Sequence, residues 1–312
     1  MTANVLRTPD ERFQNLPEFS FPPHYQQVQD DSLGSLRMHY LDEGPRDAPV
    51  VLMLHGEPTW CYLYRKLIPP LVAAGYRAVA PDHIGFGRSD KLAARSDYSY
   101  QRHVEWLGQL LTALDLRRIT LVCQDWGGPI GLRILSEMPQ RFDAVLATNT
   151  LLPNCEPPPR GVADWPGTIV RDWVHLTRNL TDLPIGETVS SVAVWPLSSE
   201  VRRAYDAPFP DPSYKAAALE FPALIPIHPH LPGVAENRRA WEFLERFEKP
   251  FLTAFSDADP STKAWEKVFR ERVPGAKKQA HVEIAHAGHF VQEEQGEVLA
   301  EALLGLLNRL YR

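Results

Sequence analysis

The stretch VCQDWGG at residues 122–128 largely decides how this chain is interpreted, because it places an acidic residue, Asp125, between a strand and a helix. The preceding run ITLVC, at residues 119–123, is apolar and partly β-branched, as in a buried strand. The following run GPIGLR, at residues 128–133, opens a helix with Pro129 just inside its start. One polar residue beside small residues on such a turn is typical of a nucleophile elbow, with Asp125 at its tip.

The residue type at the tip of this turn indicates the chemistry. A serine that displaced a leaving group from a saturated carbon would end as an ether, which water does not readily cleave. An aspartate that did the same would form an ester, and water can attack the ester carbonyl and restore the carboxylate. Asp125 therefore indicates attack on an sp3 carbon, and the alternative is an aspartate that only caps the following helix.

Composition and charge limit the classes of function. The 312 residues are 44% hydrophobic and 23% charged, with a net charge of −6 and no basic cluster, so no nucleic-acid partner is expected. The first ten residues are mixed and polar, so we expect neither a signal peptide nor a membrane helix, and we expect a cytoplasmic protein. Cys61, Cys123 and Cys155 are too few and too scattered for a disulfide framework or a metal knuckle.

The order of apolar runs predicts an α/β fold. Two strand-like runs near residues 25–28 and 36–41 suggest an opening hairpin, and strands then alternate with helices, including one expected at residues 63–73. This alternation predicts a mostly parallel, doubly wound sheet. Residues 149–248 are rich in proline and break the rhythm, so we expect an inserted helical cap there, between core segments at residues 1–148 and 249–312.

An aspartate nucleophile needs a base and an acid that orients the base. His289, in the motif HAGHF at residues 286–290, follows the last predicted strand and is the candidate base, with His286 as its rival. Asp259, in the motif SDADP at residues 256–260, follows the preceding strand and is the candidate acid. Asp257 is the alternative acid, although its side chain could instead form a turn.

Backbone and indole donors would stabilise the charges that develop in such a reaction. The N–H groups of Trp126 and Glu57, the latter in the motif HGEPTW at residues 55–60, are the candidates for an oxyanion hole. An indole N–H suits a halide leaving group because it donates and cannot accept a hydrogen bond. Trp126 is one candidate halide ligand, and Trp165, Trp173 and Trp195 in the predicted cap compete for the second position.

These motifs, together with DHIGFGRSD at residues 82–90, resemble those of the haloalkane dehalogenases, specifically the branch with two halide-binding tryptophans. The similarity implies an α/β-hydrolase core with an inserted cap, and no cofactor or metal. It also implies Asp125 as nucleophile, His289 as base, Asp259 as its partner, and Trp126 with Trp173 as halide ligands. The cap motif LPIG at residues 183–186 also looks like that branch, and by this similarity its distance along the chain implies Trp173 and not Trp165 as the second halide ligand. The proline-rich cap entrance, EPPPR at residues 156–160 and DWP at residues 164–166, departs from the pattern and leaves the substrate range open.

The resemblance implies hydrolysis of a small haloalkane by water to a primary alcohol, a halide ion and a proton, in an enzyme expected to be a monomer. An epoxide hydrolase is the alternative, because it also uses an aspartate nucleophile, and Tyr205 and Tyr214 could donate protons to an epoxide oxygen. A non-catalytic binding protein of the same fold is a further alternative. Such a protein would not need nucleophile, base and acid together.

Overall fold

The computed structural model describes residues 4–157 and 168–311. Within these ranges the core is one eight-stranded sheet, and a separate antiparallel pair joins β1 (Val5–Leu6) to β6 (Lys91–Leu92). The strands of the large sheet, in their order across it, are β10 (Val282–Ile284), β9 (Phe251–Ser256), β8 (Phe142–Thr150), β7 (Ile119–Asp125), β4 (Val50–Leu54), β5 (Arg77–Pro81), β3 (Gly34–Glu43) and β2 (His24–Asp30).

The predicted mostly parallel sheet is confirmed. From β5 through β4, β7, β8 and β9 to β10 every pairing is parallel, whereas β2 and β3 form the antiparallel hairpin at one edge. All five residues of β4 are buried, and so are the first six of β7. Continuous burial of this kind is typical of a parallel strand covered on both faces. The sheet therefore directs the carboxyl ends of β4, β7, β8 and β9 to one edge.

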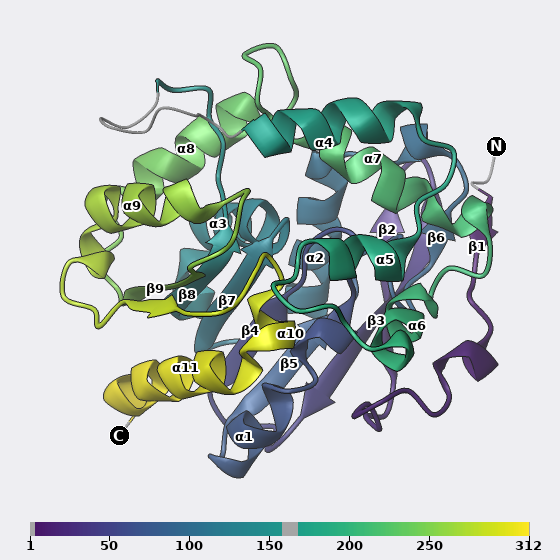
Figure 1. Cartoon of the computed structure of the whole chain (residues 1–312). Coiled ribbons are helices and arrows are strands. Elements are labelled where there is room, and N and C mark those ends of the chain that lie inside the picture. Colours follow the sequence, from purple (N-terminus) through teal and green to yellow (C-terminus); the bar gives the residue numbers. More distant parts are fainter. Residues whose placement is uncertain (1–3, 158–167, 312) are drawn as a thin grey trace.

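Helices cover the sheet and its carboxyl edge (Figure 1). Helices α1 and α11 pack against each other, and α3 packs against both α2 and α8. In Figure 1, α4 and α7 lie together at the top of the molecule and α1 and α11 at the bottom. The α-helices are α1 (Ile68–Ala73), α2 (Tyr100–Ala113), α3 (Gly127–Glu137), α4 (Thr168–Asn179), α5 (Ile185–Ser191), α6 (Ser199–Asp206), α7 (Ala216–Leu224), α8 (Val234–Leu244), α9 (Lys263–Arg272), α10 (Val291–Glu294) and α11 (Gly296–Tyr311).

The helical stretch expected around residues 63–73 is confirmed, but it is divided in two. The chain forms a short 3-10 helix, Cys61–Tyr64, and then α1, which begins at Ile68. Pro69 and Pro70 explain the division, because proline has no N–H and its ring clashes with the preceding turn unless it lies in the first turn of a helix. The helix thus starts where the two prolines are tolerated.

The segment expected as the cap contains two structural parts. Helices α4 and α7 pack together, as do α5 and α6. Helix α8 packs against α3 instead, and the indole Nε1 of Trp241 in α8 donates to Leu152 O at 2.8 Å. Because β8 and β9 are parallel neighbours, a crossover must return the chain to the start of β9, and α8 lies on that path. β8 itself extends through Asn149 to Thr150.

Three features of the chain complete this description. No helix in the described ranges is long and apolar enough to cross a membrane.

All three cysteines are free thiols: Cys61 and Cys123 are buried, and Cys155 is half-buried. Residues 158–160 and 164–166 of the proline-rich cap entrance lie outside the described residues.

Close backbone packing at the turn after β7 requires glycine. A Cβ atom on Gly127 would lie 2.1 Å from the carbonyl oxygen of Leu54 in β4, and one on Gly128 would lie 1.8 Å from Thr150 Oγ1 in β8. Neither distance is compatible with a side chain, and the first obstacle is backbone. The two glycines therefore let α3 begin directly against the ends of the neighbouring strands.

We expect Gly127→Ala to destabilise the protein by about 1–3 kcal/mol, because the added methyl group overpacks against the β4 backbone. The matched control is Gly108→Ala within α2, where the new Cβ would have only an ordinary contact, 3.4 Å from Ile134 Cδ1. That control should gain about 0.5–1 kcal/mol from helix propensity. Urea unfolding of both variants measures the difference, and equal stabilities would contradict the packing argument.

Candidate active site

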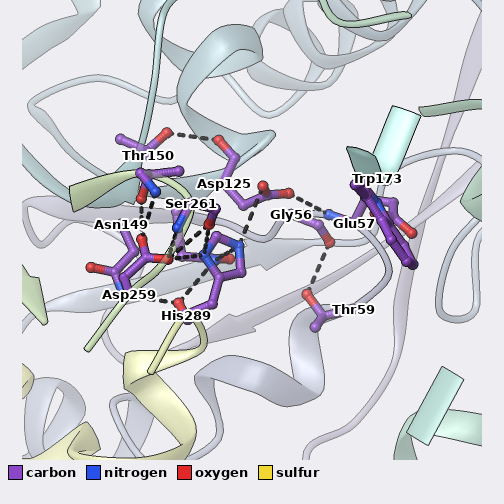
Figure 2. Close-up of polar contacts among 12 residues, drawn as sticks. Gly56, Glu57, Thr59, Asp125, Asn149, Thr150, Trp173, Asp259, Ser261 and His289 are labelled. Atoms are coloured by element: carbon purple, nitrogen blue, oxygen red, sulfur yellow. Dashed lines mark hydrogen bonds and ion pairs between the residues drawn. The ribbon is translucent and has the colours of Figure 1, made fainter. Parts of the chain in front are cut away.

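Asp125 lies at the end of β7 with its backbone in the left-handed region, at φ 48°. Its carboxylate faces two partners at the carboxyl edge of the sheet (Figure 2). The backbone N–H of Glu57 donates to Oδ1 at 2.8 Å, and Nε2 of His289 lies 3.4 Å from Oδ2. The Thr150 hydroxyl donates to the Asp125 carbonyl oxygen at 2.7 Å and so ties the turn to β8.

The loop after β4 brings the Glu57 N–H to Asp125. Gly56 permits this approach, because a Cβ atom there would lie 2.3 Å from Asp125 Oδ1. The Thr59 backbone N–H and hydroxyl both donate to Gly56 O, at 3.0 and 2.9 Å, and fix the turn. The expected oxyanion donor at Glu57 therefore points at the carboxylate, while Trp126 follows Asp125 directly at the start of α3.

His289 is held on its other side by Asp259. His289 Nδ1 lies 3.0 Å from Asp259 Oδ1, and the Ser261 hydroxyl, which donates to the same oxygen at 2.7 Å, lies 3.0 Å from Nδ1. The backbone N–H groups of Ser261 and Thr262 also donate to the Asp259 carboxylate, at 3.0 and 3.1 Å, and so does the Thr262 hydroxyl. Asp259 is 4% exposed, so these donors replace the water it has lost.

The charges in this line of residues shift one another's pKa. Burial alone would raise the pKa of Asp259, but the charge of His289 and the hydrogen bonds from His289 and Thr262 lower it well below its usual range. Burial alone would lower the pKa of His289, but Asp259 and Asp125 outweigh burial and raise it to about 10. The structure therefore favours an imidazolium between two carboxylates at neutral pH.

The alternative acid and base lie elsewhere. Asp257 accepts a hydrogen bond from the Ala287 N–H at 3.3 Å, and so connects two loops without contacting His289. Backbone hydrogen bonds from His286 and Ala287 lower the pKa of Asp257. His286 itself is exposed. Of the candidate acids and bases, Asp259 and His289 are therefore the two that lie together with Asp125.

A pocket of about 250 Å³ opens beside the Asp125 carboxylate, between the core and the cap helices. Trp126 and Trp173 both line it, whereas Trp195 is 68% exposed on the surface and Trp165 lies outside the described residues. Most of the wall is apolar. The lining residues are Glu57, Pro58, Asp125, Trp126, Leu151, Ile169, Val170, Trp173, Val174, Thr188, Ser191, Val192, Pro222, Ile225, Pro260, Ser261, Thr262, His289 and Phe290.

The two indoles of the pocket are held differently. Trp126 is nearly buried, and its ring packs edge-on against Tyr100 and Phe221. Trp173, in α4, donates from Nε1 to Glu57 Oε2 at 3.0 Å, a contact between residues 116 positions apart (Figure 2). Burial, and next the charge of Asp125, raise the pKa of Glu57 well above its usual value. The Glu57 side chain therefore contributes to the pocket as well as its backbone N–H.

One group of possible metal ligands occurs among the described residues, apart from this pocket. A nitrogen of His39, the sulfur of Cys61 and a carboxylate oxygen of Asp82 lie within 4.8 Å of one another, all buried. Asp82 already pairs with His39 Nδ1 at 2.7 Å and accepts from the Cys61 and Arg88 N–H groups at 2.8 Å. We therefore interpret the group as a structural hydrogen-bond cluster under the 3-10 helix that Cys61 begins.

Comparisons with known proteins assign the chain to a family. A profile of the alpha/beta hydrolase fold matches residues 49–177. A haloalkane dehalogenase from Psychrobacter cryohalolentis is 52% identical over 97% of this chain and 98% of its own length. Another, from Mycolicibacterium paratuberculosis, is 48% identical over 96% of this chain and 97% of its own. This chain belongs to the haloalkane dehalogenase family. The solved structure of a tetrameric haloalkane dehalogenase from Paraglaciecola agarilytica superposes with a TM-score of 0.86, at 39% identity over 96% of this chain and 98% of that one.

The tyrosines considered for an epoxide hydrolase do not line the pocket of this dehalogenase. Tyr205 is fully buried in α6, and its hydroxyl donates to Glu293 Oε2 at 2.6 Å. Glu293 in turn receives two hydrogen bonds from Arg65, at 2.6 and 2.7 Å. Tyr205 thus connects the cap to the core, and Tyr214 packs against the apolar core instead of lining the pocket.

Sequence reasoning missed several residues that position the side chains of this candidate site. The Ser261 hydroxyl bridges Asp259 and His289. The sequence did contain a sign of this contact, because a serine two residues after an aspartate commonly hydrogen-bonds with it in a turn. Gln124 Nε2 lies 3.1 Å from His289 Nε2. Asn149, at φ 37° in β8, donates to His289 O at 2.9 Å and accepts from the Ser256 N–H at 2.9 Å. Only the assembled sheet shows that these amides meet the His289 loop.

The raised pKa of His289 predicts how stability depends on pH. The folded state holds a proton on His289 up to a pKa of about 10, whereas an unfolded histidine releases it at about 6.5. The stabilisation is therefore complete below about pH 6.5 and is lost as the pH rises toward 10, at a rate of at most about 1.4 kcal/mol per pH unit.

Urea unfolding at pH 7, 8 and 9 measures this loss, and His289→Phe should flatten it. His286→Gln, a change at an exposed histidine three residues away, is the control and should keep the wild-type slope. A His289→Phe protein with the wild-type slope would contradict the assignment of the proton to His289.

Proposed function

We propose that this protein hydrolyses haloalkanes through a covalent alkyl ester of Asp125. One observation carries the proposal: the Asp125 carboxylate stands at the tip of the elbow, with Glu57 N–H 2.8 Å from one oxygen and His289 Nε2 3.4 Å from the other. It faces a mostly apolar pocket of about 250 Å³ that two indoles line. That arrangement suits attack on a small apolar substrate with an anionic leaving group.

In the first step, Asp125 attacks the halogen-bearing carbon and the halide leaves. One carboxylate oxygen forms the new C–O bond while the C–halogen bond breaks, so the pocket exchanges a carboxylate for a halide ion. The mostly apolar wall of the pocket favours this displacement, because an apolar substrate that fills it leaves little water to shield the nucleophile. Trp126 and Trp173 are the proposed donors to the departing halide, since an indole N–H offers a hydrogen bond and no repelling lone pair.

In the second step, His289 removes a proton from water, and the hydroxide attacks the Asp125 carbonyl carbon. The Glu57 and Trp126 N–H groups stabilise the oxyanion, and Asp259 stabilises the imidazolium. Esterification removes the negative charge of Asp125, one of the two charges that raise the pKa of His289. Formation of the ester therefore lowers the pKa of His289, which releases its proton to solvent and becomes the neutral base. Breakdown of the tetrahedral intermediate passes the remaining hydroxyl proton to the alcohol oxygen, so that the primary alcohol leaves, the Asp125 carboxylate returns and His289 keeps the proton it took from water.

The site supports haloalkanes better than epoxides. An epoxide oxygen needs a proton donor in the pocket, but Tyr205 is buried against Glu293 and Tyr214 does not line the pocket. The proposed roles of the nucleophile, the base, the acid and the two indoles require no cofactor. The expected monomer and cytoplasmic location stay predictions, and light scattering during gel filtration would measure the assembly directly.

Product analysis with wild type and Asp125→Ala tests the function. We expect the wild type to release bromide and protons from 1,2-dibromoethane and 1-bromobutane and to form no diol from styrene oxide. Asp125→Ala should lose bromide release by a factor of at least about 10⁴, because no nucleophile remains. Diol formation without bromide release would move the protein to the epoxide hydrolases.

Replacement of the base should separate the two chemical steps. With His289→Phe, Asp125 can still be alkylated, but no group activates the water, so the alkyl ester should accumulate. Intact-protein mass spectrometry after incubation with 1-bromobutane should show one added butyl group, located at Asp125 by peptide mapping. Catalytic bromide release by His289→Phe, with no gain in mass, would refute the role of the base.

A further inference from the structure

The indole proposed to hold the halide already has a hydrogen-bond partner. Trp173 Nε1 donates to the Glu57 carboxylate at 3.0 Å. An indole has one N–H and therefore makes one strong hydrogen bond at a time. A halide that uses Trp173 must take this donor from Glu57.

Glu57 is placed so that its charge matters to an anion in the pocket. It is 6% exposed, and its second oxygen, Oε1, is buried and has no hydrogen-bond partner among residues 4–157 and 168–311. A buried carboxylate with an unpaired oxygen is costly, and a halide beside it would add a second negative charge to the same dry space. Asp125, which accepts a hydrogen bond from the Glu57 N–H, already contributes a negative charge of its own.

We propose that the Glu57 side chain is a proton-linked competitor of the halide for Trp173 Nε1, so that each halide ion binds together with a proton taken up by Glu57. This inference rests on the proposed function, because it concerns the halide that dehalogenation releases. Ionised Glu57 keeps the indole and repels the halide. Protonated Glu57 is a weaker acceptor without a charge, and it leaves the indole to the halide. Loss of the proton to solvent then drives halide release.

The raised pKa of Glu57 supports this role, because burial and the neighbouring Asp125 both favour its neutral form. The groups that face it are few. Among the described residues that line the pocket, Glu57, Asp125 and His289 are ionisable, and those contributed by α4, α5 and α7 are uncharged. Because the pKa of His289 is about 10, its charge stays constant below about pH 8.5. Asp259 lies behind His289, and its low pKa keeps it ionised across the same range.

The test compares bromide binding by the wild type, Glu57→Gln and a control, Glu248→Gln, between about pH 5.5 and 8.5. Glutamine keeps the Glu57 backbone N–H and mimics the protonated side chain in size and charge. Glu248 is exposed, so its replacement makes the same change of residue type without touching the pocket. Bromide affinity is measured as the inhibition constant for 1-bromobutane turnover and by calorimetry. Calorimetry in buffers of different ionisation enthalpy also counts the protons taken up with each bromide.

We expect the wild-type and Glu248→Gln dissociation constants to rise at least about tenfold over this range, because only the protonated fraction is competent to bind. The binding of each bromide ion should be accompanied by the uptake of up to one proton by the protein. Glu57→Gln should change less than about threefold, and at pH 8.5 it should bind bromide as tightly as the wild type does at pH 5.5.

Two results would overturn the inference: an equal pH dependence in wild type and Glu57→Gln, or bromide binding by the wild type without proton uptake. The second needs no variant and so holds even if Glu57→Gln does not fold. Failure of the proposed function would appear differently, as the absence of bromide release from 1-bromobutane at any pH.

Discussion

The left-handed backbone of Asp125 is the constraint around which the site is organised. A residue other than glycine adopts φ 48° at a cost, and here the surrounding structure fixes it: β7 ends there and α3 starts against β4 and β8 with no room for a Cβ on Gly127 or Gly128. The result is a side chain lifted out of the sheet toward the loops that follow β4 and β10, which bring the Glu57 N–H and His289 to its two carboxylate oxygens. A change in the turn would therefore displace the Asp125 carboxylate from both of these partners.

Electrostatics then divides the pocket into two coupled halves. On one side, His289 lies between Asp125 and Asp259, and in the proposed mechanism its proton depends on whether Asp125 is a carboxylate or an ester. On the other, Glu57 shares the Trp173 donor with any anion in the pocket. Asp125 belongs to both halves, because Glu57 N–H and His289 face its two oxygens. In the proposed mechanism, the alkylation of Asp125 would therefore affect both the proton on His289 and the environment of the halide.

Much of this arrangement could be predicted from the sequence, because it follows from where strands end. Asp125, Asp259 and His289 each follow a recognisable strand, and parallel strands bring their carboxyl ends to one edge. The contact of Trp173 with Glu57 could not be predicted, since it joins residues 116 positions apart across the cap and the core. The roles considered for Tyr205 depended on burial, which only packing decides. Helix α5 could not be predicted either, because its sequence IGETVSS contains few strong helix formers and the helix packs against α6.

The buried thiols have a consequence for an enzyme whose substrates are electrophiles. Alkyl halides alkylate thiolates readily, and Cys123 lies only two residues before Asp125 in β7. Burial raises the pKa of Cys123, of Cys61 and, to a lesser extent, of the half-buried Cys155. All three sulfurs therefore remain thiols at neutral pH. The protein can hold an alkylating agent beside its own carboxylate while its cysteines resist self-inactivation.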